Sequence, residues 1–285
     1  MKISGTSGLR RRKEHRLVFN MIKESDLTIE LLDARYPQRC RSARIEEFCV
    51  SKSKPLLIVI NKSDLIPDSV AKKWKQLIKK DFPTVHISTT DRNGTTILRR
   101  AIFRYGGTDP SQENPMTVCI VGFPNVGKSS LINVLAGRKS APVSSKANFT
   151  RSLRRVKITP KLYLIDTPGI APTEILDDRE KVYLSAVSPE DLDAPDIIVS
   201  YILKQAKLHN QAENFEKYFG TSLEETTQTI LEKFAHKRGI LGKGAVPNIQ
   251  EAARVFIRDF GKGKIPYYED PVVWKQTDDL KEQNE

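Results

Sequence analysis

The strongest constraint on the fold of this chain is the stretch Gly122-Phe123-Pro124-Asn125-Val126-Gly127-Lys128-Ser129. It follows an apolar run at 117–121, which predicts a buried parallel strand, and it precedes a helical pattern at 130–136 that ends at Gly137. A strand, a glycine-containing loop and a helix in this order predict a P-loop. Backbone N–H groups of such a loop, together with the positive end of the helix dipole, bind phosphate. The stretch therefore predicts an α/β domain with a nucleoside-triphosphate site.

Side chains at the end of this stretch predict how the phosphates are held. Lys128 is placed to reach the outer phosphates, and the hydroxyl of Ser129 is placed to bind a magnesium ion. A chance match in an ordinary strand-to-helix turn is the alternative, and the four fixed residues in the right context argue against it. The expected nucleotide contacts in this segment are Asn125, Val126, Gly127, Lys128, Ser129 and Ser130.

A second motif predicts that the base is guanine. The predicted strand at 55–60 ends in Asn61-Lys62-Ser63-Asp64. The Asp64 carboxylate can accept from the ring N1–H and the exocyclic amine of guanine together, and the Lys62 stem can lie against the base. Alone, this tetrapeptide is a common turn sequence, but the P-loop in the same chain favours guanine binding. With the loop after the predicted strand at 84–87, the expected base contacts are Asn61, Lys62, Asp64, Ser88 and Thr89.

The segments after the P-loop helix predict contacts to the terminal phosphate. Residues 138–154 lack hydrophobic periodicity, which predicts a long mobile loop around Thr150. Two strands predicted within 155–165 lead into Asp166-Thr167-Pro168-Gly169, which offers a carboxylate near magnesium and a glycine N–H for the γ-phosphate. We expect these loops to form a switch that a triphosphate orders. The magnesium candidates are Ser129, Thr150 and Asp166, and the catalytic candidates are Lys128, Thr150 and Gly169.

The order of these motifs is unusual, because the guanine elements precede the phosphate elements. With this order the sequence resembles the circularly permuted GTPases of the YlqF/YawG type, which are implicated in assembly of the large ribosomal subunit. The resemblance covers most of the chain and extends beyond the nucleotide motifs. It includes Asp33-Ala34-Arg35-x-Pro37, Thr150, Asp166-Thr167-Pro168-Gly169-Ile170, Arg238-Gly239 and Phe260-Gly261-Lys262-Gly263-Lys264.

The resemblance implies a GTPase that binds GTP and GDP with magnesium and hydrolyses GTP slowly unless ribosomal particles stimulate it. Ile170 stands where many GTPases have a water-orienting glutamine, and a hydrocarbon cannot polarise water. Asn125 matches an asparagine that, in similar GTPases, helps to hold a potassium ion. Bacterial members carry an N-terminal histidine in a different context, so we expect His15, within Arg10–Arg16, to be solvated or to contact RNA.

The net charge of +12 is concentrated in clusters, which favours a polyanionic partner over a uniformly solvated surface. Residues 1–16 and 138–161 are strongly basic, and further cations lie within the C-terminal third. With the resemblance, this pattern predicts binding to rRNA and to a precursor of the large ribosomal subunit. The RNA-contact candidates are Arg11, Arg12, Arg151, Arg154, Arg155, Lys237, Arg238, Arg254 and Arg258.

Hydrophobic patterning divides the chain into parts and predicts a small all-helical C-terminal domain after a mostly parallel α/β domain. Capping-box patterns at Ser222-x-x-Glu225 and Asn248-x-x-Glu251 open two of its helices. The expected parts are a basic N-terminal extension at 1–16, a circularly permuted GTPase domain at 17–188, a helical RNA- and ribosome-binding domain at 189–272 and a polar tail at 273–285.

Composition excludes several other classes of protein. Cys40, Cys49 and Cys119 are far apart in sequence, so neither a disulfide framework nor a zinc site is expected. The chain shows no apolar run long enough to span a membrane and no signal-peptide core, and we expect a cytoplasmic monomer. Two functions stay open: a particle-stimulated GTPase that controls assembly, and a nucleotide-dependent RNA-binding scaffold with incidental hydrolysis.

Overall fold

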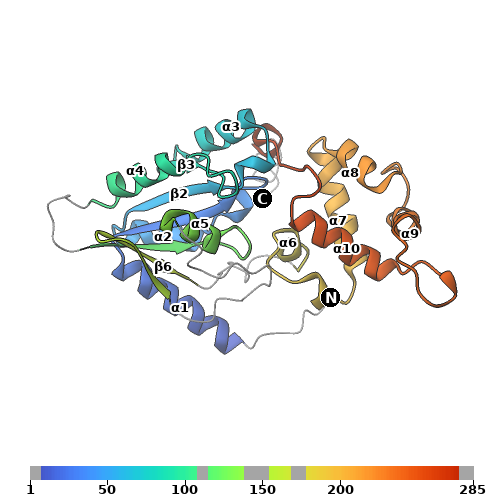
Figure 1. The fold of residues 1–285 in the computed structure, drawn as a ribbon, viewed down its shortest axis with the longest axis horizontal. Coiled ribbons are helices and arrows are strands. Elements are labelled where there is room, and N and C mark those ends of the chain that lie inside the picture. The colour runs from blue at the N-terminus through green and yellow to red at the C-terminus, as the bar shows by residue number, and fades with distance from the viewer. Residues whose placement is uncertain (1–7, 108–114, 138–153, 168–177, 276–285) are drawn as a thin grey trace, which may run out of the picture. The chain divides into compact units, whose positions relative to one another are not determined.

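A computed structural model describes residues 8–107, 115–137, 154–167 and 178–275, with the backbone alone at 8–15, 154, 166 and 178. The chain forms two compact units, within residues 5–175 and within residues 176–285 (Figure 1). The sequence places the boundary later, after residue 188. In the structure the boundary lies earlier, because Tyr183, at the end of α6 (Asp178–Tyr183), packs against Tyr201, Phe260 and Tyr267 of the second unit.

In the described residues, the first unit contains a six-stranded sheet of order β3-β2-β1-β4-β6-β5. Neighbouring strands are parallel except β5 and β6, which are antiparallel. Every residue of β1 and β2 is buried, as expected for strands covered on both faces. The strands are β1 (Leu27–Asp33), β2 (Leu56–Asn61), β3 (Thr84–His86), β4 (Met116–Val121), β5 (Arg154–Thr159) and β6 (Leu162–Asp166).

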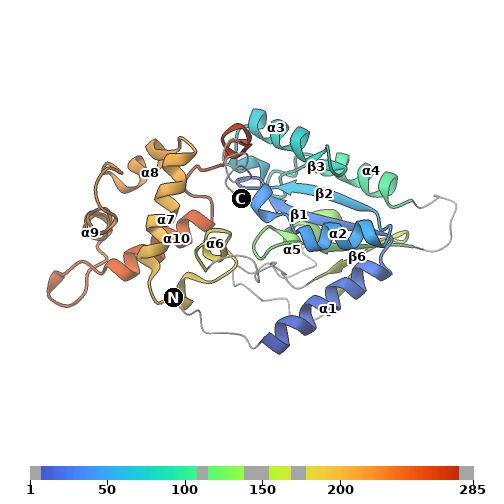
Figure 2. The same ribbon diagram turned by 180° about the vertical axis from the view of Figure 1, so that it is seen from behind.

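Helices cover the sheet of the first unit (Figures 1 and 2). In α3 the buried residues Val70, Trp74 and Ile78 recur at helical spacing and lie on one face. The first helix begins at Gly8, within the stretch that the sequence treats as a basic extension, and its Phe19 ring packs 4.7 Å from that of Phe48 in α2. The helices are α1 (Gly8–Glu24), α2 (Ala43–Ser51), α3 (Asp68–Ile78), α4 (Thr95–Tyr105) and α5 (Lys128–Ala136).

The strand order gives the sheet a point where the direction of chain progression reverses. The chain adds β2 and β3 on one side of β1 and then places β4 on its other side. In open α/β sheets, ligands bind outside the carboxyl ends of the strands at such a switch point. The segments after β1 and β4 therefore flank the expected position of a ligand.

The described part of the second unit is helical apart from an isolated bridge between Leu241 and Pro247. Its core is aromatic, and the side chains of Phe215, Phe219, Phe234 and Phe256 are almost fully buried. The helices are α6, α7 (Pro195–Leu208), α8 (Ala212–Phe219), α9 (Thr227–Arg238) and α10 (Ile249–Gly261). No helix in the described ranges has the length and apolar character needed to cross a bilayer.

Helix starts in this unit agree with one predicted cap and not with the other. Asn248 caps α10, because its side chain accepts from the N–H of Glu251 at 3.1 Å. The predicted start at Ser222 is wrong: α9 begins at Thr227, and Thr226 is its cap. The Ser222 segment forms a turn instead, because the N–H of Leu223 donates to the Glu216 carboxylate at 2.9 Å.

Candidate nucleotide-binding site

Asn61 connects three segments at the carboxyl edge of the sheet. Its side-chain amide donates to the carbonyl of Val126 in the P-loop at 2.8 Å, and its side-chain oxygen accepts from the N–H of Thr89 at 3.2 Å. Its own carbonyl accepts from the N–H of Ala34, after β1, at 2.8 Å. Because Asn61 is fully buried, these bonds fix the predicted guanine motif against the P-loop.

The P-loop approaches Asn61 so closely that only glycine fits at position 127. A Cβ atom on Gly127 would lie 2.3 Å from the side-chain nitrogen of Asn61, and the φ angle of 104° is itself unfavourable for other residues. Gly122 is similarly constrained on the other side of the loop, where a Cβ would lie 2.4 Å from the carbonyl oxygen of Leu31 in β1. The loop is therefore held between β1 and the end of β2.

Lys128, the first residue of α5, folds back over the loop that precedes it. Its ammonium donates to the carbonyls of Gly122 at 2.9 Å and Phe123 at 2.7 Å, and the side chain is buried. Phosphate oxygens carry charge and are stronger acceptors than these carbonyls. Ser129 and Ser130 follow in the first turn of α5 and are half-buried. This arrangement can exchange carbonyl partners for phosphate partners without moving the helix.

The third predicted phosphate segment begins beside the P-loop strand. Asp166 pairs in register with Ile120 of β4, and the Thr167 hydroxyl donates to the Ile120 carbonyl at 2.7 Å. Only the backbone of Asp166 is described. Outside the described residues lie Thr150, Arg151, Gly169 and Ile170.

The predicted base-binding residues lie at the ends of β2 and β3. Lys62 adopts a left-handed conformation with a φ of 64°, and Asp64 is exposed in the turn that follows. The N–H of Ser63 donates to the carbonyl of Ile87 at 3.0 Å, which joins this turn to the loop after β3. Ser88 in that loop is buried. These contacts bring all five predicted base contacts to one edge of the sheet.

A buried ion pair beneath Lys62 is a feature that the sequence offers only as a family motif. The carboxylate of Asp33, at the end of β1, accepts from Arg35 and from the Lys62 ammonium. Burial alone would raise the pKa of Asp33, but Arg35 and Lys62 outweigh it and hold that pKa well below its usual range. Asp33 is therefore charged at neutral pH.

The predicted RNA contacts are partly engaged within their own units. Arg254 donates to the carbonyl of Leu192 at 3.1 Å, and Arg258 pairs with Glu190 at 2.8 Å. A hydrogen bond from Ser188, with a further one from Arg258, lowers the pKa of Glu190 to about 2.

Two other predicted RNA contacts, one in each unit, are arginines that lie over aromatic rings. The guanidinium of Arg155 lies 4.4 Å from the centroid of the Tyr163 ring. The guanidinium of Arg238 lies 5.5 Å from the centroid of the Tyr218 ring. Lys237 is exposed, and the side chains of Arg11, Arg12 and Arg154 are not described.

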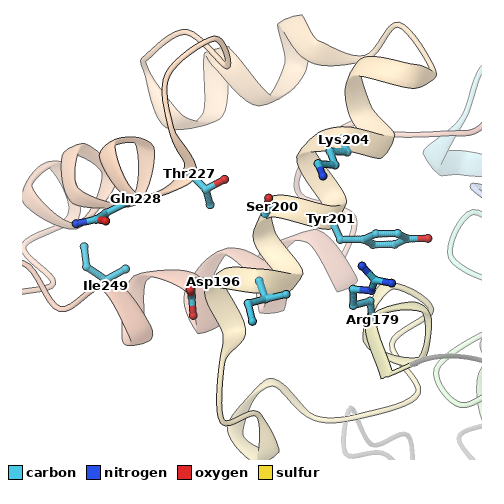
Figure 3. Close-up of a pocket in the computed structure, with 9 residues that line it drawn as sticks. Arg179, Asp196, Ser200, Tyr201, Lys204, Thr227, Gln228 and Ile249 are labelled. Carbon is cyan, nitrogen blue, oxygen red and sulfur yellow. The ribbon is translucent and has the colours of Figure 1, made fainter. Parts of the chain in front are cut away.

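The second unit contains a pocket of about 360 Å³ that no sequence motif indicates (Figure 3). The Arg179 guanidinium lies 5.7 Å from the centre of the Tyr201 ring at one end of it. Residues from four separate helices line the pocket, which explains why no local pattern predicts it. The lining is Arg179, Asp196, Ile197, Ser200, Tyr201, Lys204, Thr227, Gln228 and Ile249.

Fold and site together define the class: an α/β P-loop protein whose predicted guanine motif precedes its P-loop in the chain. Comparison with known proteins gives the same class. The family described as 50S ribosome-binding GTPase matches residues 117–233, a span that begins at β4 and leaves out Asn61 to Asp64.

Three curated relatives extend this match over most of the chain. An uncharacterized GTP-binding protein of Methanocaldococcus jannaschii is 34% identical over 258 residues, which are 89% of this chain and 66% of the relative. GTPase grn1 of Schizosaccharomyces pombe is 34% identical, over 89% of this chain and 61% of its own length. Nuclear GTP-binding protein NUG1 of Saccharomyces cerevisiae is 33% identical, over 92% of this chain and 57% of its own length. The chain thus spans about half to two thirds of the length of such relatives.

Solved structures show the same fold. GNP-bound YlqF from T. maritima superposes with a TM-score of 0.64 at 23% identity, covering 91% of this chain and 99% of that one. The GDP-bound structure of TM YlqF superposes with a TM-score of 0.61 at 24% identity, covering 90% of this chain and 99% of that one. The chain belongs to the circularly permuted GTPases of the YlqF/YawG type.

This membership confirms the predicted family and the predicted fold class. It also contradicts one prediction. The cytoplasmic location is wrong, because the yeast relatives are named as nuclear and nucleolar GTP-binding proteins. A short basic run such as Arg10-Arg11-Arg12-Lys13 fits nuclear targeting and nucleic-acid binding equally well, so by itself it does not select a compartment.

Proposed function

We propose that the chain binds GTP and GDP at the carboxyl edge of its sheet, hydrolyses GTP, and acts in assembly of the large ribosomal subunit. The observation that carries this proposal is the contact of Asn61 with both Val126 and Thr89, because it joins a guanine-type motif to a P-loop. The description of the matching family as ribosome-binding and the nucleolar names of relatives support the ribosomal part.

Each segment has a distinct role in this proposal. Asp64 reads the base, the Lys62 stem packs against it, and the P-loop N–H groups with Lys128 hold the phosphates. Hydroxyl and carboxylate oxygens suit magnesium, so Ser129, Thr150 and Asp166 would hold it. When bound, magnesium would neutralise part of the negative charge on the phosphates. Asn125, with a φ of 61° in the P-loop, would hold potassium beside the phosphates.

Hydrolysis in this proposal is slow until a ribosomal particle supplies the missing group. Ile170 replaces the glutamine that would orient water, and its hydrocarbon side chain forms no hydrogen bond. The proposed partner is a precursor of the large ribosomal subunit, bound through rRNA. In the helical unit, Tyr201 and Arg179 line one end of the pocket and are residue types that stack on an RNA base (Figure 3).

The test is GTP turnover with purified precursors of the large subunit, in potassium chloride and in the same concentration of sodium chloride. A GTPase that controls assembly gives multiple turnovers that particles and potassium both increase. The alternative function, an RNA-binding scaffold, predicts particle binding with no particle-dependent turnover.

A further inference from the structure

The ammonium of Lys62 is held by a carboxylate that lies outside the Asn-Lys-x-Asp motif. Its nitrogen lies 2.8 Å from one oxygen of Asp33, which belongs to a different strand. The side chain of Asp33 is only 2% exposed, whereas that of Lys62 is 21% exposed. Among the described residues no other ion pair of Lys62 is found. The lysine therefore reaches down from the open edge of the sheet to a buried anchor.

Asp33 is itself fixed in orientation by a neighbouring arginine. Arg35 donates through its side chain to both carboxylate oxygens, at 3.0 and 2.9 Å, and through its backbone N–H at 3.1 Å. The Arg35 guanidinium also donates to the hydroxyl of Tyr36 at 2.8 Å. Two-point pairing of this kind allows a single orientation of the carboxylate. Asp33 thus presents a stationary acceptor to Lys62.

The backbone fixes the distance that Lys62 must span. Asp33 pairs in register with Asn61, and the N–H of Ala34 donates to the Asn61 carbonyl at 2.8 Å. The end of β1 is therefore bonded to the residue immediately before Lys62. With both ends set, the lysine stem is restricted to the space between them.

We propose that Asp33, supported by Arg35, is a positioning residue that holds the Lys62 stem in place as a wall for the guanine base before nucleotide arrives. This inference rests on the proposed function, since it assigns a role within the same site. A free lysine loses side-chain entropy when a ligand packs against it, and a pre-ordered one has already lost it. Asp33 raises the affinity for guanine nucleotides, and Asp64 still chooses the base.

The test is a double-mutant cycle read by the Kd of GDP carrying a methylanthraniloyl fluorophore. Asp33→Asn keeps the size of the side chain but removes its charge, and Lys62→Met keeps an apolar stem but removes the ammonium. Each change is expected to raise the Kd about 3- to 10-fold, the cost of ordering one long side chain. The double variant is expected to bind no more weakly than the weaker single variant.

Glu30→Gln is the matched control, because Glu30 is a buried carboxylate in the same strand that bonds to the N–H of Ser42 instead. Its Kd should equal that of the wild type. Additive losses in the double variant, or an unchanged Kd for either single variant, would overturn the proposal. Lys62→Met leaves the Asp33–Arg35 pair intact, so an unchanged Kd for this variant would overturn the proposal even if Asp33→Asn does not fold. Failure of the wild type to bind GDP would instead contradict the proposed function.

Discussion

At the scale of single residues, Asn61 does more than its place in a guanine motif requires. One buried amide satisfies a carbonyl of the P-loop and an N–H of the loop after β3, and both partners lie in other parts of the sequence. An unsatisfied buried group costs about 1–3 kcal/mol, so a residue with two such partners has a large structural effect.

Asn61→Ala should lower the free energy of unfolding by about 2 kcal/mol or more, because it leaves Val126 and Thr89 without these partners. Urea denaturation measures the change. Asn93→Ala is the control, since Asn93 is exposed, and it should change stability by less than about 0.5 kcal/mol. Equal effects of the two substitutions would contradict the role given to Asn61.

A second residue, Glu30, predicts a pH dependence of stability. Burial, with the nearby Glu46, raises its pKa well above the ordinary value of 4.5, although the Ser42 N–H and Arg41 oppose the shift. A carboxyl with a raised folded pKa contributes stability that is complete below pH 4.5 and is lost as pH rises toward the folded pKa.

Glu30→Gln should remove this loss, because glutamine stays neutral and can still accept from Ser42. The variant should gain stability over the wild type as pH rises above 5, by at most about 1.4 kcal/mol per pH unit. Urea denaturation at several pH values between 5 and 8 measures this. A difference that stays constant across that range would show that Glu30 is not buried as a neutral acid.

At the scale of elements, the short apolar runs of β2 and β4, each bounded by turn residues, made these two strands predictable, because such runs are typical of strands buried on both faces. The spacing of Val70, Trp74 and Ile78 in the sequence is typical of one helix face, and these residues are buried in α3. The start of α9 could not be predicted from the capping-box pattern. Glu225 of that pattern pairs with Lys233, and the N–H of Leu223 donates to the Glu216 carboxylate. The Asp33–Lys62 contact and the pocket lined by Tyr201 depend on strand and helix neighbours that a single segment does not reveal.

The cap of α9 gives a prediction at this scale. Thr226→Ala should lower stability by about 1 kcal/mol, since its side chain accepts from the Thr229 N–H at 3.2 Å. Ser222→Ala tests the cap that the sequence alone favours, and it should cost less because Ser222 lies in an exposed turn. Thermal unfolding of the two variants decides between them, and a larger loss for Ser222→Ala would restore the sequence-based start.

At the scale of the whole molecule, the sheet brings together two predicted motifs that the chain presents in swapped order. The strand order places β1 between β2 and β4, so guanine and phosphate segments meet at one edge whichever comes first in the chain. The permutation does change the segment that comes after the phosphate-binding elements, because β6 and its loop now lead into the helical unit. Contacts to a γ-phosphate can thereby influence a unit proposed to bind RNA.

Nucleotide-dependent particle binding is expected from this connection. The chain loaded with a non-hydrolysable GTP analogue should bind precursors of the large subunit more tightly than the GDP-loaded chain. Co-sedimentation at fixed salt measures both affinities. Equal affinities would exclude coupling, because a ligand shifts only a state that it binds differentially.

In the proposed site, Asn61 to Asp64 read the base of the same nucleotide whose phosphates the P-loop holds. The sharpest test of this shared pocket is the preference of Asp64→Asn between GTP and xanthosine triphosphate, compared with the wild type by competition. The preference should move from GTP to xanthosine triphosphate, because the substitution replaces an acceptor by a donor opposite the base edge. An unchanged preference for GTP would contradict a shared pocket.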